Sequence, residues 1–177
     1  MVGHSFGGAL ALHLARTKPE LFKAVLVFEP VAFHLLKTDA PDLYQQVQQL
    51  SLQLKKLQPE DAAALFIDYW QGDGYFNTLP EVMRQKLARQ VGKVSADFEA
   101  LSGEAATLVD YARSIQCPVL LLSGDHSQLS AKRLALMLAE ALPQAEFRKL
   151  KTGHMGPVTH TDLVNAVLLE FIQRHLA

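Results

Sequence analysis

The segment that most constrains the fold is Gly3-His4-Ser5-Phe6-Gly7-Gly8, near the start of the chain. A serine with a glycine two residues away on each side is the pattern of a nucleophile elbow, a sharp turn from a β-strand into an α-helix. Such a turn holds the serine in a strained conformation and lifts its hydroxyl clear of the backbone. Side chains at Gly3 and Gly7 are expected to obstruct this turn, so the motif predicts a strand before Gly3 and a helix after Ser5.

The segments after the turn continue an alternation of helix and strand. Residues 6–17 are densely apolar and are followed by Lys18-Pro19, which predicts a helix packed beneath a sheet. Residues 24–28 (AVLVF) form a continuous apolar run, typical of a strand buried on both faces of a parallel sheet. Turn, helix and strand in this order form half of a right-handed βαβ unit, and only Met1 and Val2 represent its first strand.

Residues 31–113 differ in character and predict helices without convincing strands. One amphipathic helix, ending before Pro59, carries its apolar residues on a single face: Leu43, Val47, Leu50, Leu54 and Leu57. A second helix is expected from Pro59 to Trp70, and separate helices are expected after Pro80 and after Ser95. Most of the aromatic residues lie in this block, where they suit the apolar wall of a substrate pocket.

The last third of the chain returns to strands interleaved with helices. Strands are expected over residues 118–124 and 145–150, and helices over residues 131–141 and 163–175. This alternation is typical of an α/β protein with a parallel sheet flanked by helices.

Composition excludes several kinds of partner. The net charge is −1, and the 17 basic and 18 acidic residues are interspersed, so nothing favours a nucleic acid or a membrane as a partner. The single Cys117 has no companion for a disulfide or a metal site and is expected to pack as a small apolar residue. No signal peptide or membrane-spanning run is visible, so we expect a cytoplasmic protein. The aromatic residues of the helical block suit a pocket for a small-molecule substrate.

Three loops follow the predicted strands and carry chemically useful side chains: Glu29-Pro30, Asp125-His126-Ser127 and the segment 152–157 around His154. Ligands collect at the carboxyl ends of the strands of an open parallel sheet, where these loops meet. A serine is a poor nucleophile near neutral pH unless a base lies within hydrogen-bond reach and a third group orients that base. The loops supply a histidine and two carboxylates for these roles.

The chain resembles the α/β-hydrolases from Gly3 to its C-terminus. The matching features are the G-H-S-F-G-G turn, a helical segment after the next strand, the P-V-L-L-L-S-G strand and a G-H dipeptide after the last strand. The resemblance implies that Ser5 is the nucleophile, that His154 is the general base and that the backbone N–H of Phe6 donates to the oxyanion. His4 is expected to line the pocket as a wall or substrate contact. No set of histidines has the spacing of metal ligands, so we expect no metal site, and we expect no cofactor.

The identity of the catalytic acid stays open between two residues. The commonest pattern of the family places an aspartate where this chain has Ser127, which cannot stabilise an imidazolium by charge. Asp125 lies only one residue beyond Gly124, where it is expected to point away. Glu29 follows the strand 24–28 directly, and one branch of the family takes its acid from this strand end. We favour Glu29 and keep Asp125 as the alternative.

The resemblance also divides the chain into regions. Residues 1–30 and 114–177 correspond to the α/β-hydrolase core, and residues 31–113 correspond to an all-helical cap insertion. Members of the family carry further strands before the elbow, so the expected fold is a truncated α/β-hydrolase with a few parallel strands. Its exposed sheet edge is expected to favour self-association.

Two functions remain possible from the sequence. The first is a serine hydrolase of a small, apolar ester or related carbonyl compound, impaired in this truncated form. The alternative is a catalytically inactive fragment or interaction remnant of such an enzyme.

Overall fold

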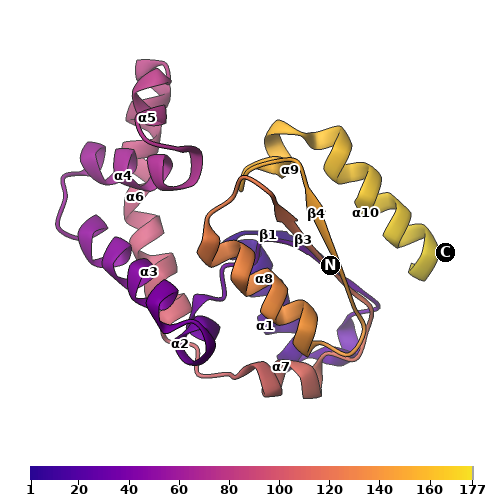
Figure 1. Cartoon of the computed structure of the whole chain (residues 1–177). Coiled ribbons are helices and arrows are strands. Elements are labelled where there is room, and N and C mark those ends of the chain that lie inside the picture. The colour runs from indigo at the N-terminus through magenta and orange to yellow at the C-terminus, as the bar shows by residue number, and fades with distance from the viewer. Residues whose placement is uncertain (177) are drawn as a thin grey trace.

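A computed structural model describes residues 1–176, with the side chain of Leu176 excluded. Four parallel strands form one sheet in the order β1-β2-β3-β4 (Figure 1). Their bounds are Val2–His4 for β1, Val25–Phe28 for β2, Val119–Gly124 for β3 and Ala145–Leu150 for β4. The expected α/β class with a parallel sheet flanked by helices is therefore confirmed.

Helices cover both faces of this sheet. Helices α1 (Phe6–Thr17) and α8 (Leu129–Ala141) lie against one face, and α10 (Thr161–Leu176) lies against the other (Figure 1). Alternate residues of the central strands point to opposite faces. Val27 and Leu121 pack toward α1 and α8, whereas Leu26 and Leu120 pack toward α10. Because β2 and β3 are buried on both faces, β2 is apolar throughout and β3 is apolar from Val119 to Leu122.

The register brings the carboxyl ends of the strands to one edge. His4 pairs with Phe28, and Phe28 pairs with Leu122, so β1, β2 and β3 end close together. β4 runs beside β3 to the pair Gly124 and Leu150. The residues that follow each strand, including Ser5 and Glu29, therefore emerge at the same edge.

The strand expected before Gly3 is present as β1, which lies along the β2 edge of the sheet. In the structure Val2–His4 pairs with β2, and the Met1 ammonium donates to the Ala24 carbonyl at 2.7 Å. β1 therefore covers that edge and forms the edge of the sheet itself.

The chain between β2 and β3 is helical. It contains short helices, α2 (Leu36–Asp39), α5 (Tyr75–Thr78) and α7 (Leu108–Ser114), and longer helices, α3 (Pro41–Leu54), α4 (Pro59–Gln71) and α6 (Glu81–Ser102). Single 3₁₀ turns lie at Pro19–Leu21 and Phe33–Leu35, and α9 (Gly156–Thr159) is a single turn before α10. Helices α4, α5 and α6 form a lobe beside the sheet (Figure 1).

Two expected helix boundaries in this region are wrong. The separate helices after Pro80 and Ser95 are one continuous helix, α6, in which an ion pair between Lys93 and Asp97 spans Ser95 at 2.5 Å. Leu57 lies outside α3, which ends at Leu54, and its side chain is exposed.

No helix within residues 1–176 combines the length and the apolar character needed to cross a membrane.

Candidate active site

Ser5 occupies the turn between β1 and α1. Its backbone has φ 54° and ψ −123°, outside the regions that residues with a side chain normally adopt. The turn is held by the Ser5 N–H, which donates to the Phe28 carbonyl at 3.1 Å, and by the Ser5 carbonyl, which accepts from the Gly8 and Ala9 amides. The strained serine is therefore fixed between the sheet and the start of α1.

The glycines of the motif are not equivalent. A Cβ on Gly3 would lie 2.5 Å from the Gly7 carbonyl oxygen and 2.8 Å from the Gly8 Cα, contacts that real side chains do not make. A Cβ on Gly7 would meet no atom within 4 Å. The steric requirement expected at both positions is thus found at Gly3 and is absent at Gly7, because the Gly7 Cβ would point into open space.

A chain of hydrogen bonds links Ser5, His154 and Glu29. The Ser5 hydroxyl lies 3.0 Å from His154 Nε2, and His154 Nδ1 lies 2.7 Å from Glu29 Oε2. A carboxylate can only accept, so His154 Nδ1 carries the imidazole proton and donates it to Glu29. His154 Nε2 is then unprotonated and accepts a hydrogen bond from the Ser5 hydroxyl. His154 and Glu29 are 2% and 0% exposed, so water is excluded from their contact.

Glu29, like Ser5, has a strained backbone and is fixed by hydrogen bonds. Its φ of 43° makes it, with Ser5, one of two non-glycine residues with positive φ among those that the structure describes. Its Oε1 accepts from the Gly124 N–H at 2.7 Å and from the Ser123 hydroxyl at 3.1 Å. Burial raises the pKa of this carboxyl, but hydrogen bonds from His154 and Gly124 outweigh burial and lower it below the ordinary value.

The alternative acid lies elsewhere. Asp125 is exposed, and its backbone N–H donates to the Leu150 carbonyl at 2.8 Å. Ser127, at the position where the resemblance expects an aspartate, is buried. Of the two carboxylates considered from the sequence, the one in contact with His154 is Glu29.

His4 lies against the same histidine. Its Nε2–H donates to the backbone carbonyl of His154 at 2.8 Å, and the two ring centroids are 4.8 Å apart. Burial, followed by the charge of a protonated His154, lowers the pKa of His4 to about 4. His4 lines the cavity at Ser5, and it also ties the His154 loop to the end of β1.

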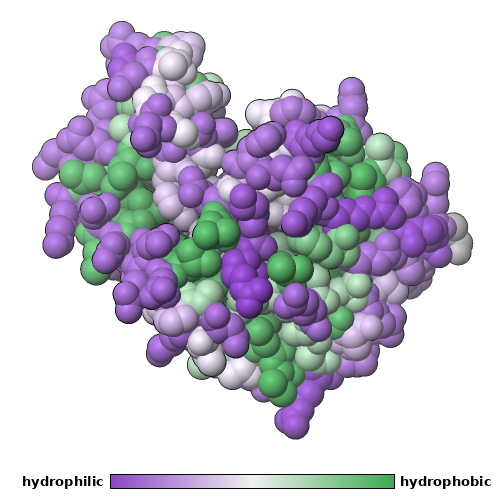
Figure 2. All heavy atoms as spheres, viewed as in Figure 1, coloured by the Kyte–Doolittle hydropathy of each residue, from purple (hydrophilic) through white to green (hydrophobic). Residues whose placement is uncertain are grey.

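Two cavities meet at Ser5. The larger, of about 340 Å³, extends from Ser5 and His154 toward Tyr75 and Met83 of the helical lobe, and its walls are almost wholly apolar. The smaller, of about 80 Å³, lies between Ser5 and Phe98. The space-filling view shows the molecule hollowed between the lobe of α4–α6 and the core near α9 (Figure 2).

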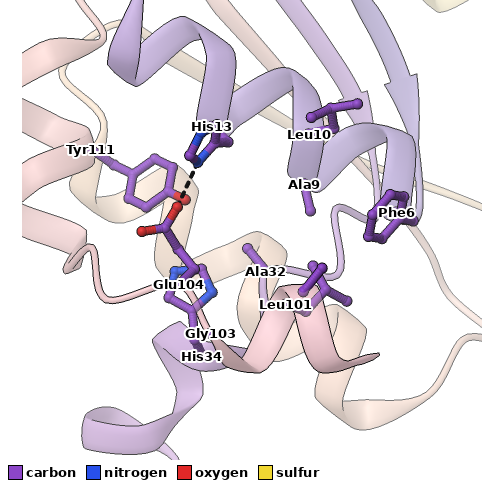
Figure 3. A pocket seen from close by; sticks show the side chains of 11 residues that line it. Phe6, Ala9, Leu10, His13, Ala32, His34, Leu101, Gly103, Glu104 and Tyr111 are labelled. Atoms are coloured by element: carbon purple, nitrogen blue, oxygen red, sulfur yellow. Dashed lines mark hydrogen bonds and ion pairs between the residues drawn. The ribbon is translucent and has the colours of Figure 1, made fainter. Parts of the chain in front are cut away.

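A further cavity, of about 420 Å³, lies beyond Phe6 (Figure 3). Its polar end is a cluster in which the Glu104 carboxylate contacts His13 Nδ1 at 2.5 Å and Arg16 Nη2 at 3.3 Å. Partial burial raises the pKa of Glu104, but hydrogen bonds from the Ala106 amide and His13, with the charge of Arg16, lower it to about 2. These ion pairs join α1 to the segment after α6, although Arg16 Nε is buried without a hydrogen-bond partner among the described residues.

One neighbour of His154 was not identified individually from the sequence. The indole of Trp70, at the end of α4, stacks on the His154 imidazole with centroids 3.6 Å apart and planes 17° apart. The one sequence feature that pointed toward Trp70 was the cluster of aromatic residues in the helical block. The stacking itself could not be predicted, because it depends on how α4 packs against the loop after β4.

Within the described part of the chain, no cluster of three or more His, Cys, Asp or Glu side chains is placed to hold a metal ion.

Comparisons with known proteins agree with this architecture. A family model described as the alpha/beta hydrolase fold matches residues 1–161. A poly(3-hydroxyalkanoate) depolymerase from Ectopseudomonas oleovorans is 24% identical over 176 residues, which cover 98% of this chain and 60% of that protein. The chain spans 60% to 66% of the length of the curated relatives that it matches.

Solved structures give the same fold at low sequence identity. The enol-lactonase from Burkholderia xenovorans LB400 has a TM-score of 0.69 at 18% identity, over 97% of this chain and 64% of that one. A thermophilic esterase from Thermogutta terrifontis has a TM-score of 0.70 at 20% identity, over 99% and 65% of the two chains. With the family model matching most of the sequence, the chain belongs to the α/β-hydrolase fold family.

Proposed function

We propose that this chain carries the nucleophile, base and acid of a serine hydrolase that acts on a small, apolar ester or related carbonyl compound. The observation that supports the proposal most strongly is the unbroken hydrogen-bond chain from the Ser5 hydroxyl through His154 to Glu29. The strained φ of Ser5 and Glu29 adds support, because backbone strain of this kind concentrates at functional sites.

The proposed reaction proceeds by acyl transfer. His154 Nε2 takes the Ser5 proton as Oγ attacks the substrate carbonyl carbon, and the buried Glu29 carboxylate stabilises the imidazolium that forms. The backbone N–H of Phe6, the first residue of α1, donates to the oxyanion of the tetrahedral intermediate. His154 then protonates the leaving oxygen. A water molecule, deprotonated by the same nitrogen, attacks the acyl-enzyme and releases the acid.

The cavities at Ser5 suggest the form of the substrate. The larger cavity suits one bulky apolar group, and the smaller cavity suits a short substituent on the other side of the carbonyl. Known relatives include proteins described as a depolymerase of poly(3-hydroxyalkanoate), a polyester, and as an enol-lactonase, so ester bonds are the first class to test.

The test is hydrolysis of p-nitrophenyl esters of increasing acyl length by the purified chain. We expect kcat/KM to rise as the acyl group lengthens and then to fall once the larger cavity is full. Ser5→Ala should abolish turnover, and Glu29→Gln should reduce it far more than Asp125→Asn. Unchanged turnover in Ser5→Ala would contradict the proposal. A folded wild-type chain without turnover would favour the inactive alternative.

A further inference from the structure

Trp70 covers the imidazole of the proposed catalytic base. The residue is 7% exposed and lines both of the cavities that meet at Ser5. Its ring is nearly parallel to that of His154 at a centroid distance of 3.6 Å, which is close contact between two aromatic faces. The indole is therefore placed to restrict rotation of the His154 ring out of the plane that joins Ser5 to Glu29.

The end of α4 that carries Trp70 is tied to the core. The Tyr69 carbonyl accepts a hydrogen bond from the side-chain amide of Gln128, and the Tyr69 hydroxyl lies 2.8 Å from Ser130 Oγ. Gln128 and Ser130 lie at the start of α8, directly after the loop that follows β3. The Tyr69 ring meets the Trp70 ring edge to face, with centroids 4.8 Å apart. The helical lobe thus holds Trp70 against His154 through contacts independent of any substrate.

Stacking on an aromatic face favours the charged form of the imidazole. The face of an indole carries partial negative charge and attracts a cation above it. In the proposed reaction His154 is neutral at the start and becomes an imidazolium as Ser5 attacks. An interaction that strengthens at this step accelerates the reaction. Among the described residues, the titratable side chains that form hydrogen bonds or ring contacts with His154 are Glu29, at Nδ1, and His4, at the His154 carbonyl and ring.

We propose that Trp70 is a positioning residue, which holds the His154 ring in line between Ser5 and Glu29 and stabilises its protonated form through the indole face. The inference rests on the proposed function, because it assigns His154 as the base. If Trp70 has this role, the helical lobe takes part in catalysis, because it places Trp70 against the proposed base and also forms a wall of the substrate cavity.

The stacking is tested first by fluorescence, without any substrate. Trp70 is the one tryptophan of the chain, and a protonated imidazole in contact with an indole quenches its emission. Emission recorded as the pH is lowered should therefore fall. The quench should disappear in His154→Phe, which keeps an aromatic ring but cannot be protonated, and should persist in His4→Gln. His154→Gln serves as a second variant if circular dichroism shows that His154→Phe is unfolded. A quench that persists in a folded His154 variant would overturn the stacking.

The catalytic consequence is tested with p-nitrophenyl acetate, whose small acyl group makes little use of the cavity walls. Trp70→Leu should lower kcat/KM by about 5- to 30-fold, and Trp70→Phe should recover part of the loss, because it restores an aromatic face. Tyr75→Leu removes an aromatic ring from the same cavity without touching His154 and serves as the matched control. A folded Trp70→Leu variant no slower than this control would overturn the role. Absence of wild-type turnover would contradict the proposed function, whereas the fluorescence result decides the stacking separately.

Discussion

His4 should make the free energy of unfolding depend on pH above the range in which carboxylates titrate. Its pKa falls from 6.5 in the unfolded chain to about 4 in the folded one, chiefly through burial. The folded state then binds fewer protons than the unfolded state, so stability is fully present above about pH 6.5 and decreases as the pH falls toward 4. At pH 5 the unfolded histidine is protonated and the folded one is neutral, which corresponds to a loss of roughly 2 kcal/mol.

The measurement is urea unfolding at closely spaced values from about pH 7.5 to about pH 5, where acidic side chains of the unfolded chain are still largely ionised. His4→Gln keeps a donor for the His154 carbonyl but cannot titrate, so its free energy of unfolding should fall by roughly 2 kcal/mol less than that of the wild type over this range. His126→Gln removes an exposed histidine from a neighbouring loop and controls for the loss of a histidine as such. Equal pH dependence in wild type and His4→Gln would refute the reasoning.

Two further predictions concern stability. Gly3→Ala should cost about 2–3 kcal/mol or more in urea unfolding, because its Cβ meets backbone atoms of Gly7 and Gly8, whereas Gly7→Ala should change stability by no more than about 1 kcal/mol. Equal effects would contradict the steric argument. Glu104→Gln should cost about 1–2 kcal/mol at neutral pH. Since the pKa of Glu104 is lowered to about 2, the wild type should lose this advantage as the pH falls from about 4.5 toward 2, and a gap unchanged at low pH would contradict the assignment.

Local patterns were sufficient for the elements of the sheet. The apolar run at residues 24–28 and the P-V-L-L-L-S-G segment are β2 and β3 within a residue, because strands buried on both faces are made of nearly continuous apolar runs. The helix after Ser5 begins and ends as expected, since the elbow sets its start and Lys18-Pro19 sets its end. The split of α6 at Ser95 was wrong because a polar residue in a long helix does not interrupt it.

The site could be predicted only in part. The order of Ser5, Glu29 and His154 along the chain indicated candidates, but a choice between Glu29 and Asp125 required the path of the backbone after β2 and β3. Glu29 has a positive φ, and its carboxylate contacts His154. The residues around Glu29 form no sequence pattern that predicts this backbone conformation. The contact of Trp70 with His154 and the hydrogen bonds of Tyr69 with Gln128 and Ser130 depend on how α4 packs against the core, which composition does not predict.

The most direct test of the proposed site is mass spectrometry of the chain after treatment with a fluorophosphonate. A serine activated by His154 and Glu29 should form a covalent adduct on the peptide that contains Ser5. Labelling should slow by about 10³- to 10⁴-fold in Glu29→Gln, which would leave His154 without a charged partner, and should change little in Asp125→Asn. A folded chain that forms no adduct at Ser5, or one whose labelling depends on Asp125 and not on Glu29, would contradict the account.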